Sequence, residues 1–128
     1  MQTEDPVNIP LCASRLILDW WDYGSTIGYR GADLREWAAN PSEAGTHWFL
    51  VWSELYSPYT TSTLIHQQGE ALYENWDFGD QYKDTLVSHD LTLEAHTNGV
   101  VYYTANWGAS GEFSWLLHSH TFVDTGVY

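Results

Sequence analysis

Residues 88–122, SHDLTLEAHTNGVVYYTANWGASGEFSWLLHSHTF, carry the longest two-residue periodicity in the chain. Side chains alternate in character over residues 89–95, which is the pattern of a strand with one buried face. Asn98-Gly99 then supplies two positions that tolerate positive φ, a strong signal of a tight hairpin. Because residues 100–107 and 113–122 are also rich in β-forming side chains, we expect a three-stranded antiparallel meander here.

The rest of the chain predicts further short strands at residues 13–23, 46–56, 60–66 and 71–78. The run at 46–56 is apolar on both faces, which favours a central strand. One short helix is expected from residue 33, because Asp33 and Glu36 have capping-box spacing, with Asn40-Pro41 ending it. The pattern predicts an all-β fold, a small antiparallel β-sandwich or β-barrel with one short helix, and the aromatic load slightly favours the barrel. An α+β roll is the alternative.

A chain of 128 residues is long enough for one domain with its own core. Residues 1–12 contain two prolines and no periodicity, so we expect an extended N-terminal arm before a single β-rich domain at 13–128. The single cysteine, Cys12, cannot form an internal disulfide and is expected to be a small buried apolar side chain.

The charge balance and the hydropathy exclude several partners. Acidic residues number 17 against 4 basic ones, giving a formal net charge of −13. Nucleic acid is therefore not expected as a partner, because phosphate binding needs clustered Lys and Arg. No apolar run approaches the roughly 20 residues of a membrane span, and the opening MQTEDPVNIP does not have the pattern of a signal peptide. We expect a cytosolic protein or a mature secreted one.

Aromatic residues are the main functional indication, with eight Trp, nine Tyr and four Phe. A core of this size accommodates about three or four tryptophans, so others should line a pocket or a surface site. The leading hypothesis is a lectin-like module that binds a glycan or another small molecule and is not an enzyme. A homo-oligomer is compatible with the sequence.

The pattern Trp-Asp-aromatic-Gly occurs at residues 21–24 and 76–79, with a partial third copy at 106–108. An indole can stack on the C–H face of a pyranose while a neighbouring carboxylate or amide accepts its hydroxyls. In the alternative interpretation these are strand ends, where Asp-x-Gly makes a turn. The expected ligand-binding residues are Trp21, Asp22, Trp76, Asp77, Asn106 and Trp107.

Two other functions stay open. A small β-barrel enzyme could hold an apolar, natural-product-like substrate in an aromatic pocket for cyclisation, isomerisation or dehydration. Its candidate catalytic residues are Asp19, Tyr23, Arg30, His118 and His120. An acidic protein-interaction or inhibitor module, for example a DNA mimic, would act instead through its negative surface.

His118-Ser119-His120 would place two imidazoles on one face of a strand, about 7 Å apart, a spacing that one metal ion can bridge. A third ligand could come from His89, His96, Glu94 or Glu112. Hydrogen-bonded histidines on a polar strand face are the commoner arrangement. We therefore expect no metal and no other cofactor, with His118 and His120 as weak metal candidates.

Overall fold

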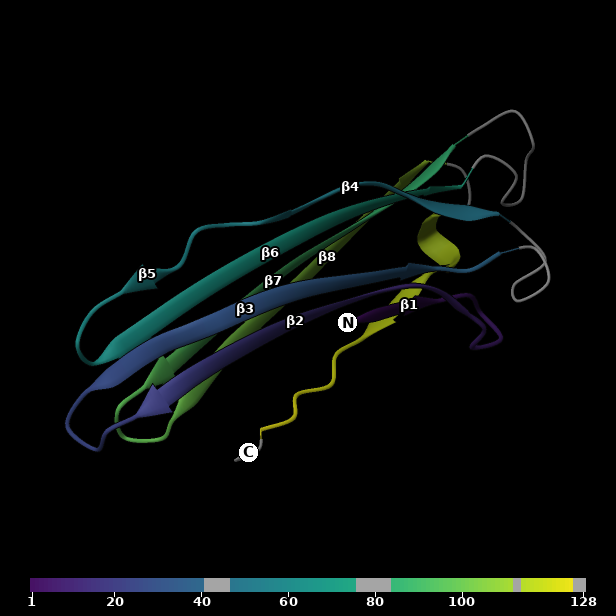
Figure 1. Cartoon of the computed structure of the whole chain (residues 1–128). Coiled ribbons are helices and arrows are strands. Elements are labelled where there is room, and N and C mark those ends of the chain that lie inside the picture. The colour runs from purple at the N-terminus through teal and green to yellow at the C-terminus, as the bar shows by residue number, and fades with distance from the viewer. Residues whose placement is uncertain (41–46, 76–83, 112–113, 126–128) are drawn as a thin grey trace.

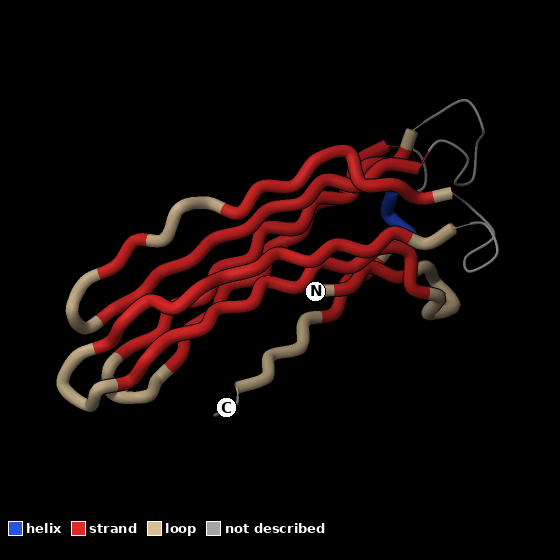
Figure 2. Tube along the Cα trace, viewed as in Figure 1, coloured by secondary structure: helices blue, strands red, loops and turns tan. Residues whose placement is uncertain are grey.

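The computed structural model describes residues 1–40, 47–75, 84–111 and 114–125. Nine strands and one turn of 3-10 helix make up the described elements, and the strands form two antiparallel sheets packed face to face (Figure 1, Figure 2). This confirms the prediction of an all-β fold and, of the two architectures left open, the sandwich. Each sheet keeps two edge strands, so the closed barrel, which the aromatic load slightly favoured, is wrong.

The first sheet has the strand order β3-β2-β1-β9. Its strands are β1 (Gln2–Glu4), β2 (Pro10–Asp22), β3 (Ile27–Ala38) and β9 (His118–His120). β2 and β3 form one long hairpin, and β1 lies between β2 and β9. The segment expected to be an N-terminal arm therefore contains a paired strand, and segments far apart in sequence lie side by side in this sheet.

The second sheet has the order β4-β6-β7-β8. These strands are β4 (Trp48–Leu55), β6 (Leu64–Asn75), β7 (Thr85–His96) and β8 (Val101–Gly111), and the short β5 (Tyr59–Thr60) also pairs with β6. β7 and β8 form the predicted hairpin, in which Gly99 has a φ of 78° and the Asn98 side chain accepts a hydrogen bond from the Val100 amide at 3.0 Å.

The prediction that residues 113–122 form the third strand of the meander is wrong. After β8, Ser114–Leu116 forms the 3-10 turn η1, and β9 then joins the opposite sheet by pairing with β1. Leu117, between η1 and β9, is only 6% exposed and belongs to a core cluster that contains residues of both sheets. Burial of this side chain draws the chain across the end of the sandwich, from one sheet to the other.

The helix predicted from residue 33 is also wrong, because this segment is the second half of β3. Every residue from Gly31 to Ala38 is paired with β2, and Asp33, Arg35 and Trp37 alternate in exposure with their neighbours. A helix of seven residues is unstable alone, whereas the strand gains a full ladder of hydrogen bonds. The run at 46–56 was expected to be a central strand, but the strand that forms within it, β4 (Trp48–Leu55), lies at the edge of its sheet.

The core between the sheets has two hydrophobic clusters. One comprises Leu11, Cys12, Trp48, Ala71, Tyr73, Val87 and Leu117, and the other comprises Leu18, Ile27, Ile65 and Ala95. Cys12 is fully buried, as expected, and this burial raises the pKa of its thiol to about 12. In the part of the chain that the structure describes, a helix with the length and apolar character of a membrane span is absent.

Candidate functional site

A chain of polar side chains crosses the core between the two sheets. His89 on β7 is 1% exposed, and its Nδ1 and Nε2 atoms lie 2.9 Å from Ser14 Oγ and 2.8 Å from Thr3 Oγ1. The Tyr73 hydroxyl lies 2.8 Å from Ser14 Oγ, and Ser119 Oγ lies 2.6 Å from Thr3 Oγ1. These contacts satisfy buried polar groups that would otherwise be costly.

The directions of these hydrogen bonds are assigned from Tyr73, which lies at one end of the hydrogen-bonded series. Tyr73 donates its only hydroxyl proton to the Ala13 carbonyl at 2.6 Å, so Ser14 must donate to the tyrosine oxygen and accept from His89 Nδ1. Burial, together with the nearby N-terminal ammonium, lowers the pKa of His89 to about 4, so the imidazole is neutral at pH 7. Its one ring proton is on Nδ1, so Nε2 accepts a hydrogen bond from Thr3. This network is a structural element of the core.

Most described tryptophans are on the surface. Trp76 lies outside the described residues, and of the other seven only Trp48 is buried. The exposed fractions are 49% for Trp21, 40% for Trp37, 43% for Trp52, 39% for Trp107 and 78% for Trp115. The prediction that the core does not absorb the tryptophans is confirmed.

The tip of the β2–β3 hairpin gathers three of the predicted residues. The Arg30 guanidinium carbon lies 4.6 Å from the ring centre of Trp21, a cation–π contact. Tyr23, 65% exposed, lies against Gly28, where an added Cβ would be only 3.2 Å from the tyrosine ring. Gly28 thereby leaves room for the Tyr23 ring next to Trp21, and the two rings and the guanidinium form one exposed surface, here called the hairpin platform.

Two carboxylates accompany the hairpin platform. Asp19 is exposed and is paired with Gly31, where a Cβ would meet no atom within 4 Å, so the surface next to this carboxylate is open. Asp22 is also exposed, and its Oδ1 accepts a hydrogen bond from the Gly24 amide at 2.8 Å that closes the turn.

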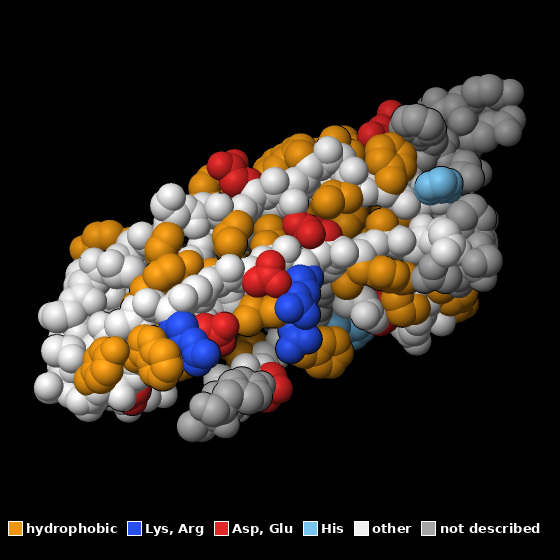
Figure 3. All heavy atoms as spheres, viewed as in Figure 1, with side chains coloured by type: hydrophobic (Ala, Val, Ile, Leu, Met, Phe, Trp, Pro, Cys, Tyr) orange, Lys and Arg blue, Asp and Glu red, His pale blue; other side chains and the backbone are white. Residues whose placement is uncertain are grey.

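The described arginines, Arg15, Arg30 and Arg35, all lie on β2 and β3 and are exposed. In the space-filling view these basic side chains lie among hydrophobic and acidic ones over the two strands (Figure 3). Arg35 is paired with Asp33 at 2.8 Å. In a chain with a net charge of −13, the outer surface of this hairpin combines cations with aromatic rings.

The other predicted ligand residues do not join the hairpin platform. Asn106 and Trp107 are consecutive on β8, so their side chains point to opposite faces of the second sheet, with Trp107 paired with the buried His89. Trp76 and Asp77 lie outside the described residues. The described members of the predicted set therefore do not converge on one site.

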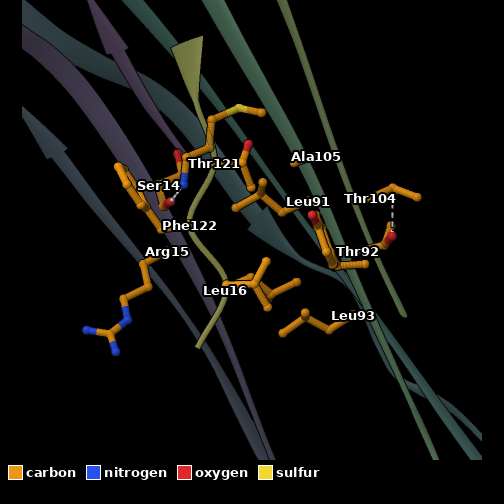
Figure 4. A pocket seen from close by; sticks show the side chains of 13 residues that line it. Ser14, Arg15, Leu16, Leu91, Thr92, Leu93, Thr104, Ala105, Thr121 and Phe122 are labelled. Atoms are coloured by element: carbon orange, nitrogen blue, oxygen red, sulfur yellow. Dashed lines mark hydrogen bonds between the residues drawn. The ribbon is translucent and has the colours of Figure 1, made fainter. Parts of the chain in front are cut away.

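A shallow cleft lies between β2 and the β7–β8 hairpin, beside the segment that follows β9 (Figure 4). Its volume is about 70 Å³, and Leu16, Leu91, Leu93, Ala105 and Phe122 supply apolar lining. Pockets for drug-sized substrates have several hundred Å³, so this cleft does not favour the barrel-enzyme hypothesis. None of that hypothesis's candidate catalytic residues lines it.

His118 and His120 point to the same side of β9 and meet Glu4 of β1 there. The Nε2 atoms of the two histidines lie 3.1 Å and 3.3 Å from the same oxygen of Glu4. Sequence reasoning missed Glu4, because residues 1–12 carry no strand-like periodicity. Of the ligands expected instead, His89 is in the core, Glu94 and His96 pair with each other on the second sheet, and Glu112 lies outside the described residues.

Comparisons with known proteins found no matching family model, no similar curated protein and no similar solved structure.

Proposed function

We propose that this protein is a carbohydrate-binding module that holds a pyranose on the hairpin platform of Trp21, Tyr23 and Arg30. The exposed indole of Trp21 next to Tyr23 carries this proposal, because sugar C–H faces pack against aromatic rings that are open to solvent. The guanidinium of Arg30 lies over one face of the Trp21 ring, so a sugar would stack on the other face. The same contact holds the orientation of the ring, which reduces the entropy lost on binding.

Polar groups for sugar hydroxyls are available beside the rings. Asp19 offers two carboxylate oxygens next to the open surface at Gly31, and Arg30 offers guanidinium donors. A donor and an acceptor flanking an apolar surface can orient a ring that carries hydroxyls on its rim. Asp22 contributes indirectly, by keeping the turn at Gly24 in place.

A glycan array followed by isothermal titration tests this proposal. Trp21→Ala should weaken binding of the selected sugar by at least about tenfold, because it removes the stacking surface. Trp52→Ala is the matched control, since Trp52 is exposed to a similar extent, 43%, but lies on β4 of the other sheet. Binding that is equally weakened by both variants, or the absence of sugar binding, would contradict the proposal.

Salt dependence separates this function from the acidic interaction module. Stacking against a neutral sugar should change little between low and high salt, whereas binding of a basic partner by a chain of net charge −13 should weaken steeply. Binding of a protein partner that falls with salt and persists in Trp21→Ala would favour the interaction module.

A further inference from the structure

We infer that Glu4, His118 and His120 form a binding site for one divalent transition-metal ion such as Zn²⁺. Each of the three residues offers one potential ligand atom, and these three atoms all lie within 4.8 Å of one another. Among the described residues, no other group of three His, Cys, Asp or Glu side chains meets this condition. Two imidazoles and one carboxylate are a ligand set used by zinc and by non-haem iron. This site is separate from the hairpin platform, since β9 and β3 are opposite edges of the first sheet.

Strand pairing brings the three ligands together. Glu4 is directly opposite His118 in the antiparallel pair, and His120 is two residues further on the same strand, so all three side chains share one face. Thr3 and Ser119, the alternate pair, point to the other face and join the buried network through their 2.6 Å hydrogen bond. The core therefore anchors both strands directly beneath the proposed site.

Two of the three distances between the ligand atoms match those of a metal site, and the third is at most 4.8 Å. A tetrahedral ion with bonds of about 2.0–2.1 Å separates neighbouring ligand atoms by about 3.3 Å. The observed separations from Glu4 Oε2 are 3.1 Å to His118 Nε2 and 3.3 Å to His120 Nε2. The imidazole rings are nearly perpendicular, with centres 5.3 Å apart, so small rotations can aim both Nε2 atoms at one ion.

Neighbouring groups hold the ligands in position. The side chain of Glu4 is 11% exposed. One carboxylate oxygen, Oε1, accepts a hydrogen bond from Gln2 Nε2 at 2.6 Å, which leaves Oε2 for the ion. Asn8 Oδ1 lies 3.1 Å from His118 Nε2 and is available as a fourth ligand. Among the described residues Asn8 is the non-glycine residue with positive φ, 65°, in a turn that Asp5 stabilises through the amides of Val7 and Ile9.

The histidines are open to solvent on the other side. Their side chains are 36% and 51% exposed, so an ion can reach the site and keep positions for water or another small ligand.

A second His-Glu-His group, on the second sheet, does not bring both imidazoles to one carboxylate oxygen. His66 and His96 contact different oxygens of Glu94, at 3.3 Å and 2.7 Å, on the second sheet. It therefore serves as an internal control.

Titration of the tag-free full chain with Co²⁺, followed by visible absorption, and with Zn²⁺, followed by calorimetry, tests the inference. We expect one ion per chain and d–d bands of low-symmetry Co²⁺. Glu4→Gln and His120→Asn should each lower Zn²⁺ affinity by about 100-fold or more, and Gln2→Ala by about tenfold. His96→Asn should bind like the unsubstituted chain.

Circular dichroism and sugar binding of the variants are measured alongside their metal affinity. Circular dichroism checks that each variant is folded, and if Glu4→Gln does not fold, His120→Asn at an exposed position carries the test alone. Unchanged affinity in a folded His120→Asn variant, or an equal loss in His96→Asn, would overturn the site and leave a hydrogen-bonded cluster only. Sugar binding by His120→Asn should be unaffected, so failure here and failure of the carbohydrate proposal are distinguishable.

Discussion

Nδ1 of His89 lies 2.9 Å from Oγ of Ser14, so a hydrogen bond between β7 and β2 joins the two sheets inside the core. The imidazole is almost inaccessible to water, at 1% exposure, and each of its nitrogens faces a hydroxyl group. A core that contains a neutral histidine couples the stability of the sandwich to pH.

We predict that the free energy of unfolding falls as pH is lowered from about 6.5 to about 4. The pKa of His89 is lowered from 6.5 to about 4 in the folded protein, chiefly by burial. Over this window the unfolded chain binds the proton and the folded chain does not, so protonation favours unfolding. The full difference corresponds to about 3 kcal/mol. Urea unfolding at several pH values measures it.

His89→Gln is the control for this pH dependence. It removes the titrating group while keeping a polar side chain, so the slope of stability against pH between 4 and 6.5 should be smaller by close to one proton. Carboxylates also titrate at the lower end of the window, but they contribute equally to both proteins. Identical slopes in the two proteins would show that His89 does not carry the effect.

Tyr73→Phe should reduce the free energy of unfolding by about 1–3 kcal/mol. The substitution removes the hydroxyl that accepts from Ser14 and donates to the Ala13 carbonyl, while the buried ring stays. Tyr59→Phe, at a position 62% exposed, should change stability by less than about 0.5 kcal/mol. Denaturant titrations of both variants provide the comparison, and equal effects would argue against the buried network.

Gly69→Ala should destabilise the protein by about 1–3 kcal/mol, because the sheets approach closely there. A Cβ at this position would lie 3.1 Å and 3.3 Å from methyl carbons of Leu34 and Leu16 on the facing sheet. At Gly31 a Cβ would meet nothing within 4 Å, so Gly31→Ala should be neutral within about 0.5 kcal/mol. Thermal melts distinguish the two, and a neutral Gly69→Ala would mean that the sheets can separate to accommodate a methyl group.

Local patterns predicted some elements well. Asn98-Gly99 between two alternating runs correctly indicated the β7–β8 hairpin, because both the turn and the strand period are properties of neighbouring residues. The same kind of reasoning failed for β3. Asp33 and Glu36 have helical capping spacing, yet pairing with β2 outweighs that weak local preference.

The candidate sites were only partly predictable. Trp21 was predicted as a ligand residue, and Tyr23 and Arg30 as catalytic candidates of a different function. The pairing of β2 with β3 brings the three residues together. The proposed metal site needs Glu4 beside His118, across 114 positions, and that contact exists only because β9 leaves the meander and pairs with β1. No local pattern encodes such a change of sheet.

Sequence alone determined that this chain forms alternating β-strands, is strongly acidic and has more tryptophan than its core can hold, since these properties depend on composition and on side chains a few residues apart. Tertiary structure decided which strands pair, which faces are buried and which polar groups meet. Those choices depend on burying Leu117, Trp48 and their neighbours between two sheets, a cooperative free energy to which segments from the whole chain contribute.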